Sequence, residues 1–216
     1  AKISQAVSLL GTQQVHDLVL ATVVIAGTSG LHGSQSSLRN FWRLSLTLAS
    51  AAKLIAEDCG ILDAERVFVA GLISQLGQLV VDQAMADDSQ RLQQQAATDD
   101  LDLATLQRET FGFDHAAVAA ALFKGWNLPT ELIEPIQWHT QPDQAGDRDL
   151  EASILNIATA LSRGIISDVM LDDMLSAFNE SAWQTTELSR ERLMTLRDET
   201  LALTQDMAPI LLDLAA

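Results

Sequence analysis

Apolar residues recur along the chain with the spacing of α-helices, and no segment shows the strict alternation of apolar and polar residues that is typical of a strand. The first long apolar face runs over residues 38–56, and Gly60 then provides a C-terminal stop. Asp63 is placed to cap a second helix, Ala64–Ala84, which is apolar on nearly every side and is therefore expected to be buried. The pattern predicts an all-α fold.

Further amphipathic segments follow a polar stretch at residues 87–102. One begins near His115 and ends before Pro129, a residue that suits the first turn of the next helix. That next helix contains Pro135, which lacks a backbone donor and should distort it. Residues 141–149 form the best candidate for a linker, and another amphipathic helix is predicted after them.

The C-terminal segment carries apolar residues separated alternately by three and four positions, the spacing that two helices need to interlock their side chains. This seam consists of Leu193, Leu196, Thr200, Leu203, Met207, Ile210 and Leu214. Pro209 argues against a long uninterrupted coiled coil. Two interpretations stay open: the seam docks on the chain's own domain, or residues 190–216 form a dimer with a second copy.

The net negative charge of the chain argues against some classes of binding partner. The 216 residues carry 29 acidic and 13 basic side chains, a formal net charge of −16. The net charge is +1 over residues 1–60, −8 over 61–142 and −9 over 143–216, so the acidity belongs to the later two thirds. An acidic surface argues against binding to the phosphate backbone of a nucleic acid and against docking on an anionic membrane.

The lack of a recognisable targeting signal and the single cysteine favour a cytoplasmic protein. The longest apolar run, Leu18–Gly27, has about half the length that a membrane span requires, and no signal-peptide pattern is present at Ala1. Because the chain does not begin with methionine, we expect residues before Ala1 in the full-length protein. The lone Cys59 excludes an internal disulfide and a four-cysteine zinc site.

Side chains suited to catalysis are scarce. The sequence contains neither a phosphate-binding loop nor a nucleophilic serine in a glycine-flanked turn. His115 lies on the apolar face of its helix directly after Asp114, a candidate cap, and His139 lies in a last helical turn, where the dipole favours positive charge. Two histidines need a carboxylate to hold a divalent ion, so a structural role is the simplest interpretation of each.

Several segments in order carry the motifs of one family. They are VFVAGLISQLGQLV at residues 67–80, FGFDHAAV at 111–118 with WNLP at 126–129, IQWHTQP at 136–142, FWRLS at 41–45, and residues 3–20. Together they resemble the HDOD family, the HD-related output domains of bacteria. The resemblance implies a compact HD-like helical domain over residues 1–142, with residues 143–216 as a C-terminal helical extension that packs on it or continues it. Nothing before Ile3 is left to match the family's N-terminal helices, so we expect a trimmed chain.

The resemblance also locates a lost metal centre. Related HD phosphohydrolases hold divalent metal with a histidine, a His-Asp pair and a later aspartate, and the matching positions here are Leu44, Ser74, Gln75 and Thr159. Leucine offers no ligand, and the other three offer only weak neutral oxygens. His115 and His139 match histidines of the HDOD motifs and alone are remnants. The resemblance therefore implies no metal, no cofactor and no catalytic residue.

Three functions stay open at this stage. The first is a non-enzymatic bacterial signal-transduction or regulatory module that acts through protein–protein interaction, with a protein partner or by self-association. The second is a metal-dependent phosphohydrolase with an unconventional site of His115, His139 and carboxylates such as Asp114 or Asp82. The third is a small-molecule sensor that uses the vestigial cleft.

Small residues on the signature helix bear on the fate of the metal centre. Gly71, Ser74 and Gly77 are spaced three apart on the signature helix, where they permit the close approach of another helix. We therefore expect the former metal centre to have become packed core.

Overall fold

The computed structural model describes residues 35–99, 101–169 and 178–214. Every regular element of this part of the chain is a helix, which confirms the all-α prediction. The elements are α2 (Gln35–Asp58), α3 (Ala64–Ser74), α4 (Leu76–Ala84), α5 (Ala86–Asp99), α6 (Leu103–Phe111), α7 (His115–Gly125), α8 (Thr130–Trp138), the short 3-10 helices η2 (Pro142–Gln144) and η3 (Gly146–Arg148), α9 (Asp149–Ser167), α11 (Glu180–Thr186) and α12 (Arg190–Leu214). The segment 3–20 that carries part of the family resemblance lies outside the described residues.

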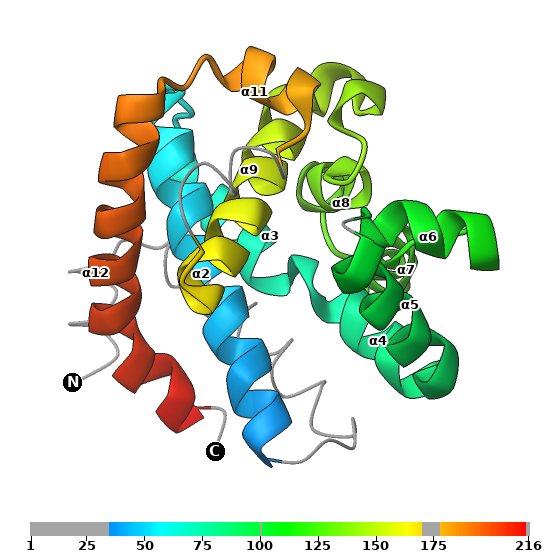
Figure 1. Cartoon of the computed structure of the whole chain (residues 1–216). Coiled ribbons are helices and arrows are strands. Elements are labelled where there is room, and N and C mark those ends of the chain that lie inside the picture. Colours follow the sequence, from blue (N-terminus) through cyan, green and yellow to red (C-terminus); the bar gives the residue numbers. More distant parts are fainter. Residues whose placement is uncertain (1–34, 100, 170–177, 215–216) are drawn as a thin grey trace.

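Helix α2 is the centre of the larger half of the molecule. Helices α3, α9 and α12 all pack against it, and α12 lies alongside it in Figure 1. Helix α7 packs between α4 and α8 in the other half, and α8 in turn contacts α3 and α9. The predicted linker at 141–149 holds η2, η3 and the start of α9, so it is a pair of tight turns between α8 and α9.

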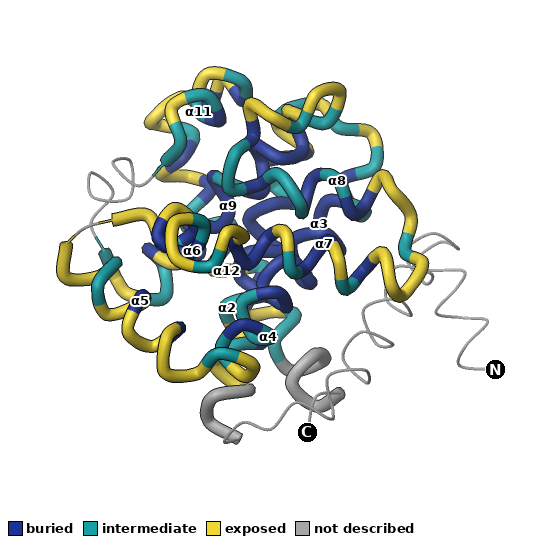
Figure 2. The backbone as a smooth tube through the Cα atoms, turned by 90° about the vertical axis from the view of Figure 1, so that its right-hand side faces the viewer, coloured by how far each residue is buried: buried dark blue, intermediate teal, exposed yellow. Residues whose placement is uncertain are grey.

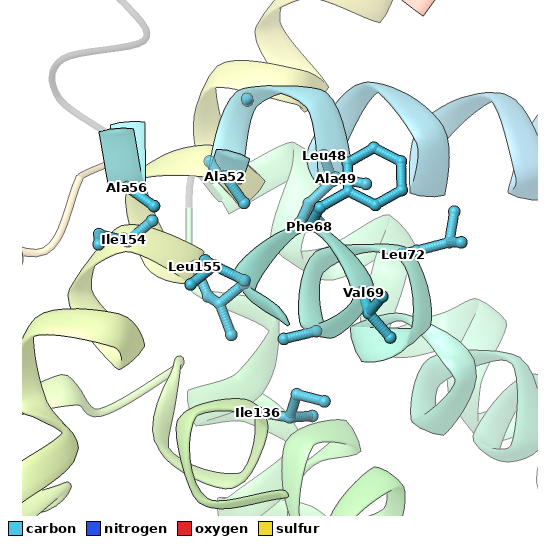
Figure 3. Packing of buried hydrophobic residues seen from close by; sticks show 14 of the residues in the cluster. Leu48, Ala49, Ala52, Ala56, Phe68, Val69, Leu72, Ile136, Ile154 and Leu155 are labelled. Atoms are coloured by element: carbon cyan, nitrogen blue, oxygen red, sulfur yellow. The ribbon is translucent and has the colours of Figure 1, made fainter. Parts of the chain in front are cut away.

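Side chains of α2, α3 and α9 interlock in the apolar core, and α8 adds Leu132, Ile133 and Ile136 to the same cluster. Figure 3 shows part of it. These side chains are buried. Those labelled in the figure are Leu48, Ala49, Ala52, Ala56, Phe68, Val69, Leu72, Ile136, Ile154 and Leu155. Burial of this kind supplies the main free-energy gain of folding, since each fully buried aliphatic side chain contributes roughly 1.5–3 kcal/mol.

Local signals predicted the boundaries of several helices. Gly60 has φ +74°, a left-handed conformation that ends the chain's run through α2 at little steric cost. The side chain of Asp63 accepts a hydrogen bond from the backbone N–H of Arg66, as expected for the cap of α3. Pro129 is the N-cap of α8 rather than a residue of its first turn.

Pro135 lies inside α8, as predicted, and its missing N–H leaves the carbonyl of Glu131 without its usual helical donor. Nη1 of Arg66, a residue of α3, donates to that carbonyl oxygen at 2.9 Å. Because Pro135 cannot donate to this carbonyl, the carbonyl accepts a hydrogen bond from Arg66 instead, and this bond joins α3 to α8.

The single helix predicted over Ala64–Ala84 is wrong in one respect, because it breaks at Gln75 into α3 and α4. Two different partners explain the break. A Cβ atom added to Gly71 would lie 2.9 Å from Cα of Ala49 in α2, whereas one added to Gly77 would lie 1.9 Å from the carbonyl oxygen of His115 in α7. The change of direction at Gln75 lets each half approach its own partner helix.

Among the described residues, Ala64–Ala84 is the one stretch long and apolar enough to be a candidate membrane span. Its most apolar window is 67% buried inside the fold. The break at Gln75 and this burial identify α3 and α4 as core helices.

The polar stretch at 87–102 holds a helix, α5, that the apolar pattern did not reveal. Only Ser89 and Leu92 of α5 are buried, and most of this helix is coloured as exposed in Figure 2. A helix that buries so little leaves almost no periodicity in the sequence.

Helix α12 turns much of the C-terminal seam inward. Leu193 and Leu196 are fully buried and belong to the same core cluster as α2, and Thr200 is buried as well. The helical backbone continues past Pro209 to Leu214. The first part of the seam therefore docks on the chain's own domain, while a dimer through residues 190–216 stays a prediction.

Candidate functional site

The positions matched to the lost metal ligands are mostly packed into the interior. Ser74, Gln75 and Thr159 are buried, whereas Leu44 is half-buried. Both hydroxyls bond to their own helices: Oγ of Ser74 donates to the carbonyl of Gly71 at 3.0 Å, and Oγ1 of Thr159 donates to that of Leu155 at 2.7 Å. Such bonds to the preceding turn occupy the hydroxyl proton locally.

The fold brings His115 and His139 together. His115 is the first residue of α7 and His139 is the C-cap of α8, and their ring centroids lie 5.5 Å apart in an edge-to-face arrangement. Their exposed fractions are only 3% and 1%. Two residues that are distant in sequence thus form a buried histidine pair at the contact of α7 with α8.

Hydrogen bonds determine which nitrogen of each ring carries the proton. Nδ1 of His115 lies 2.8 Å from Oε1 of Gln107, and Nδ1 of His139 lies 2.7 Å from the carbonyl oxygen of Ile136. Because these oxygens can only accept, each Nδ1 donates and each neutral ring keeps a lone pair on Nε2. Nε2 of His139 is buried and has no hydrogen-bond partner among the described residues.

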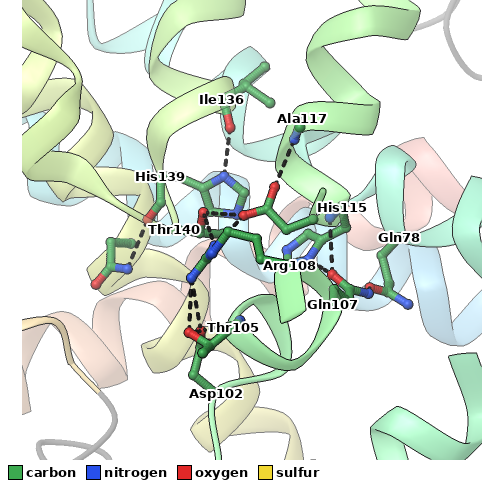
Figure 4. A network of polar contacts seen from close by, with 12 residues as sticks. Gln78, Asp102, Thr105, Gln107, Arg108, His115, Ala117, Ile136, His139 and Thr140 are labelled. Carbon is green, nitrogen blue, oxygen red and sulfur yellow. Dashed lines mark hydrogen bonds and ion pairs between the residues drawn. The ribbon is translucent and has the colours of Figure 1, made fainter. Parts of the chain in front are cut away.

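Gln107 holds the end of α7 in place. Its Oε1 also accepts the backbone N–H of His115 at 3.0 Å, and its Nε2 donates to Oε1 of Gln78 at 2.8 Å. These contacts fix the orientation of the amide, since the two N–H donors of His115 require the oxygen to face them. Figure 4 shows the chain of contacts from α4 through α6 to α7.

Both histidines are neutral at physiological pH. The pKa of His115 is lowered to about 3, chiefly by burial and then by the nearby His139 and Arg163, while Asp114 acts in the opposite direction. Burial likewise lowers the pKa of His139. His139 lies at a helix end, where the dipole favours positive charge, but loss of hydration is the largest influence on its pKa and keeps the ring neutral.

Asp114 is the N-cap of α7, which confirms the predicted cap. Its carboxylate accepts from the backbone N–H of Ala117 at 2.9 Å and from Oγ1 of Thr140 at 2.8 Å, and it forms an ion pair with Arg108. Burial alone would raise the pKa of Asp114, but these hydrogen bonds and the nearby charges lower it overall. Asp114 therefore stays ionised and ties α6, α7 and the residue after α8 together.

Sequence reasoning missed Gln107, Arg108 and Thr140, which complete this network (Figure 4). One signal was present for Gln107, a polar residue three positions after the buried Ala104 on the same face of α6. No local pattern marks Arg108 or Thr140, because their partner Asp114 lies on another element.

Arg163 was missed as well. Arg163 is exposed and lies one turn after Thr159 on α9. Its positive charge contributes to the lowered pKa of both histidines. A permanent positive charge near the pair opposes the binding of a cation there.

The residues present do not fit the divalent metal of HD phosphohydrolases. No group of three or more histidine, cysteine, aspartate or glutamate residues that could hold a metal ion occurs in the part of the chain that the structure describes. Asp114 is committed to Arg108, Thr140 and Ala117. Asp82 accepts hydrogen bonds from Gln78, Ser89 and Gln93 through Oδ1.

A surface pocket of about 420 Å³ lies elsewhere, between the end of α7 and α8. Its lining residues are Lys124, Asn127, Leu128, Thr130, Ile133, Glu134, Gln137 and Trp138. Neither histidine of the pair lines it, so this pocket is distinct from the histidine pair.

The fold is an HD-like helical domain with a buried histidine pair at the contact of α7 with α8. The family model of the HDOD domain matches residues 1–142, and the chain belongs to the HDOD family. The match ends in η2, so α9, α11 and α12 follow it.

Solved structures share the fold over nearly the whole chain. A provisionally assigned phosphohydrolase from Shewanella amazonensis has a TM-score of 0.72 at 21% identity, covering 94% of this chain and 76% of its own. An HDOD domain protein of unknown function from Geobacter sulfurreducens has a TM-score of 0.67 at 19% identity, covering 99% and 72%.

A third similar structure is a provisionally assigned signal transduction protein from Marinobacter aquaeolei, with a TM-score of 0.63 at 17% identity, covering 82% of this chain and 39% of its own. At these identities the three structures establish the fold alone. A comparison with curated proteins found no match.

Proposed function

We propose that the chain is a non-catalytic regulatory module of bacterial signal transduction, located in the cytoplasm, that acts by binding another protein molecule. The observation that carries the proposal is the state of the centre where HD phosphohydrolases hold metal. Ser74 and Thr159 bond to their own helices, and Asp114 is neutralised by Arg108. Membership of the HDOD family and the likeness to the Marinobacter aquaeolei signal transduction protein support a regulatory role.

The chemistry of hydrolysis explains why this state matters. A bound divalent ion lowers the pKa of its water and polarises the phosphoryl oxygen, and both effects need a metal held by several anionic or imidazole ligands. Two neutral imidazoles beside a committed carboxylate provide too few ligands. The scaffold then serves to present surfaces rather than to perform chemistry.

A second candidate is the metal-dependent phosphohydrolase. It is favoured by the histidine pair, since His115 and His139 each donate Nδ1–H to an oxygen and keep an Nε2 lone pair, the orientation that metal-bound histidines adopt. The Shewanella amazonensis structure is assigned provisionally to this class. We rank it second because the carboxylate beside the pair, Asp114, is already paired with Arg108, and no group of metal-binding side chains occurs among the described residues.

Hydrolysis assays with metal analysis separate the two. The purified chain, loaded with Mn²⁺ and desalted, is analysed for bound metal and assayed with bis(p-nitrophenyl) phosphate and a panel of nucleotides. We expect no stoichiometric metal and no metal-dependent turnover. Turnover that needs Mn²⁺, is lost in His115→Ala and is retained in the exposed control Glu109→Ala would overturn the proposed function. Circular dichroism of each variant establishes that it is folded.

The small-molecule sensor stays a prediction. A thermal-shift screen with nucleotides tests it, and Gln137→Ala in the surface pocket compared with His139→Ala in the pair distinguishes the two places where a ligand could bind.

A further inference from the structure

The outward face of α12 carries its own apolar pair. While Leu193 and Leu196 are turned into the core, Met194 and Leu201 have exposed fractions of 56% and 45%. They are seven residues apart, so they lie on one side of the helix, two turns from each other. Isolated exposed apolar residues are common, but a pair in register along one helix face forms a stripe that a second helix can cover.

The charges of α12 are divided along its length. Residues 190–197 contain Arg190, Arg192 and Arg197 against the single acid Glu191, whereas the acids of residues 198–206 have no base among them. Those acids are Asp198, Glu199 and Asp206. A parallel pair of such helices would oppose like charges, while an antiparallel pair brings the basic half of each onto the acidic half of the other.

One antiparallel register satisfies both patterns. If Met194 of one copy lies opposite Leu201 of the second, then Arg197 lies opposite Asp198, because both pairs are symmetric about the same point of the helix. A two-fold axis repeats each contact, so two Met–Leu contacts flank two Arg–Asp contacts. Arg197 has only one ion pair among the described residues, a 3.4 Å contact with the exposed Asp168, and can exchange it.

We propose that α12 pairs in antiparallel register with α12 of a second copy through its outward face, with Met194 against Leu201 and Arg197 against Asp198. This inference rests on the proposed function, because it names a second copy of the chain as the protein that the module binds. The inward seam stays in the core of its own chain, so dimer formation does not require the domain to open.

Sedimentation velocity of the full chain at concentrations from micromolar to several hundred micromolar tests the pairing. We expect reversible dimerisation that is weakened at least tenfold in Met194→Glu/Leu201→Glu. Leu101→Glu is the matched control, since Leu101 is 46% exposed on another part of the surface, and it should leave the dissociation constant unchanged.

Exchange of the charges tests the register. Arg197→Asp and Asp198→Arg should each weaken the dimer several-fold, because each places like charges opposite one another, and the double variant Arg197→Asp/Asp198→Arg should restore it. A dimer that resists the double glutamate variant, or a double charge variant no better than the single ones, overturns the proposal.

The outcome is separable from that of the proposed function. A chain that stays monomeric at every concentration and shows no metal-dependent hydrolysis overturns the self-pairing, while a regulatory module with a different protein partner stands. Metal-dependent hydrolysis overturns the proposed function whatever the oligomeric state.

Discussion

Helices α3 and α4, on the two sides of Gln75, each approach a neighbouring helix closely at a glycine, but the groups around the two contacts differ. On one side, α3 approaches α2 at Gly71, and its neighbours are the apolar Leu48 and Ala49. On the other side, α4 approaches α7 at Gly77, directly beneath the backbone of His115. Both contacts depend on a missing side chain, but only the second lies beside a buried network of charges and amides.

The difference separates what each region needs in order to be stable. The α2–α3 contact gains free energy from apolar area removed from water, a term that does not depend on protonation. The α4–α7 contact stays stable only while its buried donors and acceptors are partnered and its histidines are neutral, because an unpaired buried polar group costs about 1–3 kcal/mol. The α4–α7 contact is therefore expected to tolerate fewer changes of side chain or protonation than the α2–α3 contact.

Substitution of the two glycines tests this comparison with the largest expected effect. Gly77→Ala places Cβ 1.9 Å from a backbone oxygen that cannot move without α7, so we expect a loss of about 3 kcal/mol or more in the free energy of unfolding. Gly71→Ala meets Cα of Ala49 at 2.9 Å and the movable Cδ2 of Leu48 at 3.0 Å, and should cost about 1–3 kcal/mol.

Urea unfolding measures both losses. Gly125→Ala is the control, since no atom lies within 4 Å of its added Cβ, and its effect should stay within about 1 kcal/mol. Equal losses at Gly71 and Gly77 would contradict the expected difference between an approach of 2.9 Å at Gly71 and one of 1.9 Å at Gly77.

The two N-cap aspartates give the next largest difference. Asp114→Ala removes the cap of α7 and leaves Arg108 and Thr140 without their shared acceptor, so we expect a loss of about 3 kcal/mol. Asp63→Ala removes the half-exposed cap of α3, with an expected loss of about 1 kcal/mol. Thermal and urea unfolding at neutral pH give both values, and similar losses would mean that the network adds nothing to the cap.

Acid should weaken the polar region selectively. The folded protein keeps the pKa of His115 at about 3, whereas an unfolded chain binds that proton near pH 6.5. The unfolded state therefore takes up more protons as the pH falls, and stability that is present above pH 6.5 is lost below it. Between pH 7 and pH 5 we expect a loss of roughly 2 kcal/mol from His115 alone.

His139 acts in the same direction, because burial lowers its pKa too. In His115→Gln, the free energy of unfolding should depend less on pH over this range than in the wild type, whereas the exposed control Gln94→Ala should retain the wild-type slope. An unchanged slope in His115→Gln would show that the pKa of His115 is the same in the folded and the unfolded protein.

The smallest effects are expected at Ser74 and Thr159, two of the positions that the family resemblance matches to metal ligands. Ser74→Ala and Thr159→Ala remove hydroxyls that bond only to their own helices, so each should change the free energy of unfolding by less than about 1 kcal/mol. Addition of Mn²⁺ should change neither the wild type nor the variants. A metal-induced rise in melting temperature that disappears in Thr159→Ala would identify that hydroxyl as part of a working metal centre.

Much of the fold could be predicted because its signals are local. The all-α class, the caps Asp63 and Asp114 and the stop at Gly60 each follow from groups within one turn of the residue concerned, where the backbone's unpaired donors and acceptors must be satisfied. The sequence also singled out His115 and His139, through their motifs. It did not reveal Gln107, whose partners lie on α4 and α7.

Other features were decided only when the helices came together. The break at Gln75 exists because two helices approach its two sides, and His139 is neutral because neighbouring elements remove its water. The C-terminal seam docks inward because α2 lies beside it, and this leaves Met194 on the outside. Sequence alone determines where a helix begins, ends and is apolar, since those are properties of one turn. Tertiary structure decides which face of a helix packs against which neighbour and which titratable side chains stay charged. The reason is that the desolvation of a group depends on everything packed around it.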